Sequence, residues 1–438
     1  MPRLLLACAL LLASLFGARP ASAQALEIDI VGGHAAALPI AVVDMAYLGA
    51  GAAPATDIAA VIRADLDRSG SFRTLPVQDL VERPARFSEV NFATWRLLKQ
   101  DFLLVGRVLD NLEGGYRVEF ELMDVAKQER LLGLALAGRP GSMRDIAHQI
   151  ADHVYEKILG IRGAFWTRIA YVTATGVGQG IQYSLMVADA DGYNPQTVVR
   201  SREPLLSPAW SPDGRRLAYV SFERGNSSIY IQEIATGSRE LVASFRGING
   251  APAFSPDGGR LALTLSRSGN PEIYVMDLAS KALTQITRHW SIDTEPVWMP
   301  NGEHLLFTSD RAGKPQIYMV PVAGGEPRRL TFQGEYNARA TVCCDGRKIA
   351  MAQGNGNVYR IALLDRTLGE PGRFVPLSPG ELDESPSFAP NGSMLLYASR
   401  EGRKGVLYAV SADARVRQRL VLADGDVREP AWSPFRPR

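Results

Sequence analysis

The sequence is poor in cysteine, and its few cysteines are badly placed for a disulfide framework. Three occur among 438 residues: Cys8 lies in the first apolar stretch, and Cys343 and Cys344 are neighbours. Adjacent cysteines rarely pair with each other, because the small ring that they form distorts the peptide between them. The fold must therefore rest on packing, which is more typical of a large exported protein than of a small disulfide-dense secreted domain.

The sequence also lacks an excess of either charge. It contains 48 lysine and arginine residues and 46 aspartate and glutamate residues. A surface for nucleic acid or for anionic lipid would require a clear bias toward lysine and arginine. The balance therefore predicts no nucleic-acid partner and no direct insertion into a membrane.

The one long apolar run lies at the N-terminus. Arg3 precedes it, the run extends from Leu4 to Phe16, and Ala21-Ser22-Ala23 follows. A basic residue, an apolar core and an A-x-A site in this order are typical of a secretory signal peptide. The run is too short to span a bilayer, and Cys8 has too little apolar sequence before it for lipid attachment. We expect a cleaved signal peptide over residues 1–23 and a periplasmic product.

Signatures of catalysis and of metal binding are scarce. No Gly-x-Ser-x-Gly nucleophile elbow occurs. His148 and His153 fall on one predicted helix, but their spacing does not place both on one face for a metal, so we expect satisfied or surface histidines. Cys343 and Cys344 lack a second pair that would complete a zinc site. The sequence thus predicts a protein that is not an enzyme and has no cofactor or metal.

An internal repeat organises the last two-thirds of the chain. The motif is an aromatic residue followed by a Ser-Pro-Asp-Gly-like turn, and its six copies begin at Trp210, Phe254, Trp298, Val342, Phe388 and Trp432. The spacings are 44, 44, 44, 46 and 44 residues, which is the length of a four-stranded propeller blade. Each complete copy continues with an apolar strand and a tyrosine-centred strand, such as Leu217–Val220 and Ile229–Ile231.

The two ends of the repeat complement each other. The strand that normally follows the turn occurs once more at Ile169–Val172, without a turn motif before it. The last motif, at Pro430–Pro434, has no strand after it. One C-terminal strand can therefore complete the first blade, and closing the ring leaves no exposed radial edge. We predict an all-β six-bladed β-propeller over residues 164–438, closed by the C-terminal strand.

Residues 24–163 show no such period and predict a separate α/β domain. Thr56 or Asp57 can cap a helix that ends at Arg68, and Ser142 can cap a second helix that ends at Leu159. Strands are expected at Glu27–Val31, Ile40–Val43, Phe102–Leu109, Tyr116–Met123 and Leu131–Ala137. Strands interleaved with helices favour a small layered α/β domain.

Two repeated residue types resemble binding sites but have simpler explanations. Asp213, Asp257 and Asp345 could form a carboxylate ring, yet aspartate belongs in any type I turn and each should serve its own. The aromatic residues that open the motif should pack as wedges between blades rather than form a stacking cage.

The loops before each inner strand differ between repeats while the framework repeats, which marks a surface for a partner. Three residues before each motif lie Ser207, Ala251, Glu295, Arg339, Ser385 and Glu429. The predicted partner-binding residues at this mouth are Asn249, Ala251, Asp293, Thr294, Glu295, Asn337, Arg339, Asp383 and Glu384. The alternatives are a merely solvated rim and a propeller-based hydrolase of the sialidase type.

The chain resembles the TolB family of periplasmic proteins over its whole mature length. The resemblance is carried by Arg168–Val172, Asp191–Asn194, Ser207–Gly214, Asn249–Phe254, Tyr274–Leu278, Thr294–Pro296 and Pro430–Pro434. The chain departs from the family at Cys343-Cys344, where Ser-Pro is usual, which puts the shape of that turn in question.

The resemblance implies a monomeric binding hub of the Tol–Pal cell-envelope system. The propeller mouth would bind the lipoprotein Pal, and the mature N-terminus would bind the inner-membrane protein TolA, supporting outer-membrane integrity and constriction during cell division. The N-terminal segment consists of Gln24, Ala25, Leu26, Glu27, Ile28, Asp29 and Ile30. Its alternation predicts a half-buried strand. This strand either forms the first edge strand of its domain or detaches and adds to a sheet of TolA.

Overall fold

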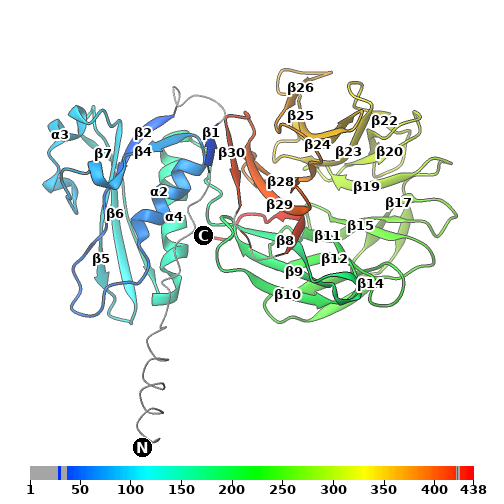
Figure 1. Ribbon diagram of the computed structural model, residues 1–438, viewed down its shortest axis with the longest axis horizontal. Helices are drawn as coiled ribbons and strands as arrows, with labels where there is room; N and C mark the ends of the chain where they lie inside the picture. The colour runs from blue at the N-terminus through cyan, green and yellow to red at the C-terminus, as the bar shows by residue number, and fades with distance from the viewer. Residues whose placement is uncertain (1–27, 31–36, 421, 423–424) are drawn as a thin grey trace, which may run out of the picture.

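The computed structural model describes residues 28–30, 37–420, 422 and 425–438. An N-terminal domain of strands and helices lies beside a β-propeller (Figure 1), which confirms the predicted fold class. The predicted signal peptide, residues 1–23, and the segment Gln24–Glu27 lie outside the described residues. Among the helices that are described, none combines the length and the apolar character that crossing a membrane requires.

One mixed sheet forms the centre of the N-terminal domain. Its strands follow the order β4-β2-β5-β6-β7, with β3 also pairing with β5. Strand β2 is parallel to β4 and β5, whereas β5, β6 and β7 are antiparallel. The bounds are Leu38–Val42 (β2), Ala46–Tyr47 (β3), Phe72–Thr74 (β4), Phe102–Asp110 (β5), Tyr116–Asp124 (β6) and Glu129–Gly138 (β7).

Helices cover both faces of this sheet. Helices α2 (Ile58–Arg68) and α4 (Met143–Leu159) pack over Ile40 and Val42, where the core residues are almost fully buried. Asp57 caps α2 by accepting a hydrogen bond from the Ala60 amide at 2.9 Å. On the opposite face, Trp95 of the short helix α3 (Phe92–Leu97) is fully buried. Single-turn 3-10 helices lie at Val77–Asp79, Phe87–Glu89, Pro140–Ser142 and Gly178–Gly180.

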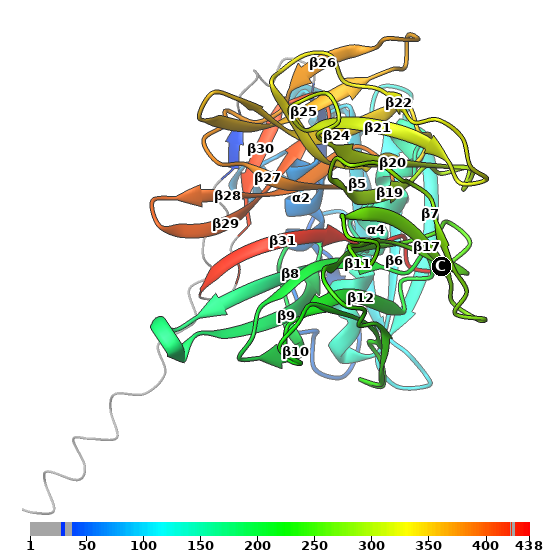
Figure 2. The ribbon, with the colours of Figure 1, turned by 90° about the vertical axis from the view of Figure 1, so that its right-hand side faces the viewer.

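Six antiparallel blades, each with four strands from the propeller's own part of the chain, form the ring (Figure 2). Blade 1 has the order β31-β8-β9-β10, and blades 2 to 6 follow in chain order as β11–β14, β15–β18, β19–β22, β23–β26 and β27–β30. The bounds are Arg168–Thr175 (β8), Gln182–Asp189 (β9), Gln196–Ser201 (β10), Leu205–Trp210 (β11), Arg216–Ser221 (β12), Ser228–Glu233 (β13), Arg239–Ala243 (β14), Asn249–Phe254 (β15), Arg260–Leu265 (β16), Glu272–Asp277 (β17), Leu283–Gln285 (β18), Asp293–Trp298 (β19), His304–Ser309 (β20), Gln316–Pro321 (β21), Arg328–Arg329 (β22), Tyr336–Val342 (β23), Lys348–Asn355 (β24), Val358–Asp365 (β25), Arg373–Pro376 (β26), Glu384–Phe388 (β27), Met394–Glu401 (β28), Lys404–Ser411 (β29), Val416–Arg419 (β30) and Asp426–Trp432 (β31).

The two ends of the propeller meet in blade 1. Strand β31 pairs antiparallel with β8, with Trp432 opposite Ile169 and Asp426 opposite Ala174. Figure 2 shows the two strands side by side although they come from opposite ends of the domain. This is the pairing that the missing and surplus strands of the repeat require.

The turn motif closes through its own side chains. In blade 2, Ser211 Oγ donates a hydrogen bond to Asp213 Oδ1 at 2.5 Å. In blade 5, Cys343 Sγ makes the corresponding bond to Asp345 Oδ1 at 2.6 Å, and Gly346 keeps its left-handed φ of 72°. The predicted role of the aspartates is confirmed, and the thiol takes the place of the serine without changing the turn.

The aromatic residues of the motif pack between blades, as predicted. The indole N–H of Trp210 donates to the carbonyl of Ala431 at 3.0 Å, and that of Trp298 donates to the carbonyl of Ala253 at the same distance. Each indole thus bonds to the inner strand of the preceding blade. These bonds satisfy the polar end of a ring whose body is buried.

Candidate partner-binding site at the loop mouth of the propeller

The six inner strands, β11, β15, β19, β23, β27 and β31, run in the same direction along the central channel. We call the end where loops lead into these strands the loop mouth, and the end with the Ser-Pro-Asp-Gly turns the turn mouth. The N-terminal domain contacts the turn mouth, where the Asn391 amide donates to the carbonyl of Arg162 at 2.9 Å. The loop mouth is thus the end at which a partner can approach the channel without meeting this contact.

A ring of six residues with left-handed backbone lines the channel. Their φ angles lie between 46° and 56°. They are the residues three positions before each motif: Ser207, Ala251, Glu295, Arg339, Ser385 and Glu429. Non-glycine residues adopt this conformation rarely, so its recurrence at the same position of all six inner strands is a regular feature of the blade and not an accident of one loop.

The ring residues occupy a β-bulge in each blade. In β11, for example, the register with β12 shifts between Leu206 and Ala209, and the extra residue falls at Ser207. Each left-handed residue costs about 1–3 kcal/mol of backbone strain. Such strain is concentrated at functional sites, where it aims a side chain. Here it directs the ring residues toward the channel.

Arg339 connects most of the ring through a single ionic network. Its guanidinium binds both carboxylate oxygens of Glu429, at 3.0 and 2.9 Å, and its Nε lies 3.1 Å from Glu295 Oε1. Its backbone N–H also donates to Glu295 Oε2 at 2.9 Å, and its side chain donates to Ser385 Oγ. Because Glu429 Oε2 accepts from the Ser207 amide at 3.3 Å, the network joins five of the six blades.

The network is only partly shielded from solvent. The side chains of Arg339 and Glu295 are each 26% exposed, and that of Glu429 is 12% exposed. Burial alone would lower the pKa of Arg339, but the charges of Glu429 and Glu295 outweigh it and hold the pKa above its usual value. The guanidinium therefore stays charged, and two glutamates against one arginine leave the ring with a negative charge.

The ring lies in a cavity of about 480 Å³ that follows the channel toward the turn mouth. Proline and alanine from the inner strands line much of it, and Cys344 reaches it from the turn of blade 5. The carboxylates of Glu295 and Glu429 are both bound by Arg339. Neither is therefore placed as an available acid or base for a hydrolase.

Four of the predicted mouth residues are buried and have partners within the chain. Asn249 donates to the carbonyls of Ser227 and Phe245, and Asp293 forms an ion pair with Arg311 at 2.7 Å. The amide of Asn337 donates to the side chain of Gln316, and Asp383 accepts from Ser378 and Ser399. These four side chains, Asn249, Asp293, Asn337 and Asp383, fix the loops of the mouth and do not present a surface to a partner.

The other predicted residues lie closer to solvent. Ala251, Glu295 and Arg339 belong to the ring, and the hydroxyl of Thr294 lies 3.4 Å from that of Thr264. Glu384 is exposed at the start of β27. The structure therefore brings Ala251, Thr294, Glu295, Arg339 and Glu384 to the mouth and its channel.

Sequence reasoning missed a set of exposed apolar side chains around the loop mouth. Trp290 is 81% exposed and Phe332 is 67% exposed, and Ile248, Ile292 and Leu382 are each 45–49% exposed. These residues form an apolar rim, defined by Ile248, Trp290, Ile292, Phe332 and Leu382. The repeat held a signal for them, because Ile248, Ile292 and Leu382 each directly precede the buried polar residue that starts the mouth.

The described part of the predicted N-terminal segment lies on the propeller. Strand β1 (Ile28–Ile30) pairs antiparallel with β30, with Asp29 opposite Arg417, and extends the outer edge of blade 6. The expectation that this strand forms the first edge strand of the N-terminal domain is wrong. In the described residues, β4 and β7 are the edge strands of that domain's sheet. The remaining residues, Gln24–Glu27, lie outside the described part of the chain.

Comparison with known families matches both parts of the chain. The TolB amino-terminal domain family matches residues 26–131, and the TolB beta propeller domain family matches residues 155–436. Together the two matches cover most of the chain.

Individual proteins give the same result. The chain is 74% identical over 416 residues to the Tol-Pal system protein TolB of Xanthomonas euvesicatoria pv. vesicatoria, which covers 95% of this chain and 94% of that protein. The same values hold for the protein of that name from Xanthomonas campestris pv. campestris. Among solved structures, TolB from Acinetobacter baumannii is 40% identical and superposes with a TM-score of 0.85, covering 94% of this chain and all of the other.

Proposed function

The chain belongs to the TolB family of Tol–Pal system proteins, and from this membership and the geometry of the loop mouth we propose that it binds a Pal-type lipoprotein there. In this proposal the chain is a periplasmic, monomeric binding hub without catalysis. It neither binds nucleic acid nor inserts into a membrane, and it supports outer-membrane integrity and constriction at division.

The observation that carries the proposal is the apolar rim. Exposed apolar side chains scattered singly over a surface need no explanation, but a group at one site marks an interaction surface. Here the group lies on the loops that lead into β15, β19, β23 and β27, at the mouth whose polar centre is Arg339 with its glutamates. Large aromatic residues such as Trp290 and Phe332 are the residue type that most often dominates binding energy at protein interfaces.

The proposed contact therefore differs from the set expected from the sequence. The rim supplies the apolar anchors, while Ala251, Thr294 and Glu384 are the predicted residues whose position allows direct contact. The buried Asn249, Asp293, Asn337 and Asp383 act by holding the loops in place. Ala251 is the one ring member without a polar side chain, so blade 3 does not contribute a ring side chain to the ionic network.

A TolA-type partner is proposed for the N-terminal segment, residues 24–30. Strand β1 covers only three residues, and its backbone bonds to β30 are of the kind that another sheet edge could replace. Terminal segments held by few contacts are released with little disturbance to the core. We propose that the segment exchanges between β30 and an edge strand of TolA.

The test of the mouth is a calorimetric titration with the soluble domain of a Pal-type lipoprotein. Replacing both Trp290 and Phe332 by alanine should weaken binding by about 2 kcal/mol or more, roughly 30-fold, because hot-spot aromatics contribute at this level. The matched control is Leu97→Ala, since Leu97 is 84% exposed but lies on the N-terminal domain. Equal affinities for the double variant, the control and the native chain would contradict the proposal that the loop mouth binds the lipoprotein.

A further inference from the structure

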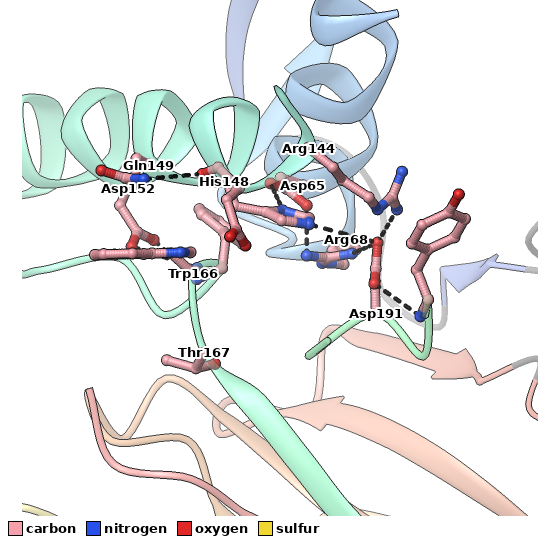
Figure 3. Close-up of polar contacts among 12 residues, drawn as sticks. Asp65, Arg68, Arg144, His148, Gln149, Asp152, Trp166, Thr167 and Asp191 are labelled. Carbon is pink, nitrogen blue, oxygen red and sulfur yellow. Dashed lines mark hydrogen bonds and ion pairs between the residues drawn. The ribbon is translucent and has the colours of Figure 1, made fainter. Parts of the chain in front are cut away.

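A buried ionic cluster joins the N-terminal domain to blade 1. Asp65 and Arg68 belong to α2, Arg144 and His148 to α4, and Asp191 to the turn between β9 and β10 of the propeller (Figure 3). The side chains of Asp65 and His148 are 0% and 1% exposed, and that of Asp191 is 8% exposed. Charged groups are rarely buried this deeply unless they bind one another.

His148 lies between the two carboxylates. Its Nδ1 is 2.7 Å from Asp65 Oδ2, and its Nε2 is 3.9 Å from Asp191 Oδ2. Figure 3 shows the ring between the aspartate of its own domain and the aspartate of the propeller. A carboxylate only accepts hydrogen bonds, so Nδ1 must carry a proton toward Asp65.

The second ring nitrogen decides the protonation state. In a neutral ring Nε2 would turn a lone pair toward the carboxylate of Asp191, and the two would repel. In the imidazolium both nitrogens carry protons, and each faces an acid. Burial alone lowers the pKa of His148, but Asp65 and then Asp191 outweigh burial and Arg68, and the pKa is raised above its usual value.

Arginines complete the cluster. Arg68 binds the other oxygen of Asp65 and lies 3.5 Å from Asp191 Oδ2, which Arg144 also binds. The Tyr193 amide donates to Asp191 Oδ1 at 3.1 Å. Because these arginines already balance both acids, the cluster has no surplus of negative charge with which to hold a metal ion.

Other charged groups lie near His148 outside the cluster. On α4 these are Asp145, which is paired with Arg436 from the chain end, and Asp152, which accepts from the Phe165 amide. On β9 the nearby acid is Asp189. Burial raises the pKa of both Asp152 and Asp189 to about 6. Arg162 also lies near the far end of α4.

We propose that His148 in its protonated form is a pH-sensitive latch that holds Asp191, and with it blade 1, against the N-terminal domain. Only Asp191 comes from the propeller, so losing the proton removes one of the three cations that attract it across the interface. The docked state binds the proton more tightly than the undocked state. Docking is therefore strongest below the pH at which an undocked histidine titrates, and it weakens as pH rises through the higher value of the docked state.

The expected size of the effect follows from this linkage. A difference of about one pKa unit between docked and undocked states changes the docking equilibrium about tenfold. Burial raises the pKa of Asp152 and Asp189 to about 6, so a change that these two carboxyl groups cause lies at the acid end of the range.

The test is hydrogen exchange of the full mature chain between pH 6 and pH 9, corrected for the intrinsic rate. In the native chain the amides of residues 189–194 should lose protection several-fold as pH rises. In His148→Gln the protection should be lower at pH 6 and should not change with pH. His153→Gln is the matched control, because His153 lies on the same helix outside the cluster, and it should behave as the native chain does.

A second variant keeps the proposal testable if His148→Gln folds poorly. Asp191→Asn removes the propeller's acid from a turn, and it should lower both the protection at pH 6 and the titration midpoint of His148 followed by NMR. Native protection that is flat with pH would overturn the latch. So would a pH dependence that persists in His148→Gln, or a midpoint unchanged in Asp191→Asn.

Discussion

Arg339 illustrates how one residue can hold the centre of a ring-shaped molecule. It comes from blade 5, yet its side chain binds acids of blade 4 and blade 1. The neighbouring bulges aim these residues at one another, so the network depends on backbone that is already strained. The ring therefore couples blades that are far apart in the sequence.

Replacing Arg339 by glutamine should destabilise the propeller. The change leaves Glu295 and Glu429 near each other without their shared cation, and breaking a buried ion pair typically costs 3–5 kcal/mol. Because the Arg339 side chain is 26% exposed, solvent screens part of this loss, and we expect a cost below that range, about 2–3 kcal/mol. Urea unfolding followed by tryptophan fluorescence measures it.

Arg215→Gln is the control for this change. Arg215 is also paired with a glutamate, at 3.8 Å, but its side chain is 74% exposed. Its loss should change the unfolding free energy by less than about 0.5 kcal/mol. Equal effects of the two substitutions would show that the ring network contributes nothing beyond a surface pair.

Strand β31 is the element on which closure of the ring depends. Deleting residues 430–438 would remove Trp432, whose indole donates to Thr167, and the interdomain ion pairs of Arg436 and Arg438. Trp432 is partly buried in the core, so its loss costs part of the about 3–5 kcal/mol typical of a fully buried tryptophan, and the lost pairing of β31 with β8 adds to it. We expect the cooperative thermal transition to be lost or shifted down by more than ten degrees, measured by circular dichroism, since about 4–8 °C accompanies each kcal/mol in a small domain and less in a large one.

A chain that lacks only Arg438 provides the comparison for that deletion. It loses one exposed ion pair with Glu156 and keeps all of β31. Its melting should match that of the full chain. An unaltered transition in the nine-residue deletion would mean that blade 1 is stable without residues 430–432 of its inner strand.

The proposed contact with TolA depends on strand β1. A chain that begins at Gly32 lacks β1 and keeps the whole rim of the loop mouth. It should bind a Pal-type domain with affinity within about twofold of the mature chain, and it should show no binding to TolA in a titration. Retained TolA binding would reject the N-terminal segment as the site.

Repetition made the propeller predictable at the level of the whole molecule. Six copies of one motif give six independent indications of the same blade, and the turn residues report directly on backbone geometry. In the N-terminal domain, the cap at Asp57 and the expected ends at Arg68 and Leu159 matched the two long helices. Helix α3 was not predicted, because a helix of six residues is too short to show a helical periodicity in the sequence.

The site was predictable in its location but not in all of its side chains. In a regular strand Asn249 and Ala251 would share a face, and both were expected at the mouth. The bulge at Ala251 inserts an extra residue, so Asn249 turns into the protein while Ala251 lines the channel. The same shift buries Asp293, Asn337 and Asp383. The contact of His148 with Asp191 depends on domain packing, which no local pattern encodes.

The most direct measurement of the central claim is hydrogen exchange of the whole mature chain with and without a Pal-type lipoprotein domain. We predict slower exchange in the loops that lead into the inner strands, at residues 245–250, 288–294, 332–338 and 378–384. Exchange in the turns at residues 211–215, 255–259 and 389–393 should stay unchanged. Protection confined to those turns or to the N-terminal domain, with the loop mouth unaffected, would contradict the claim that the loop mouth is the binding face.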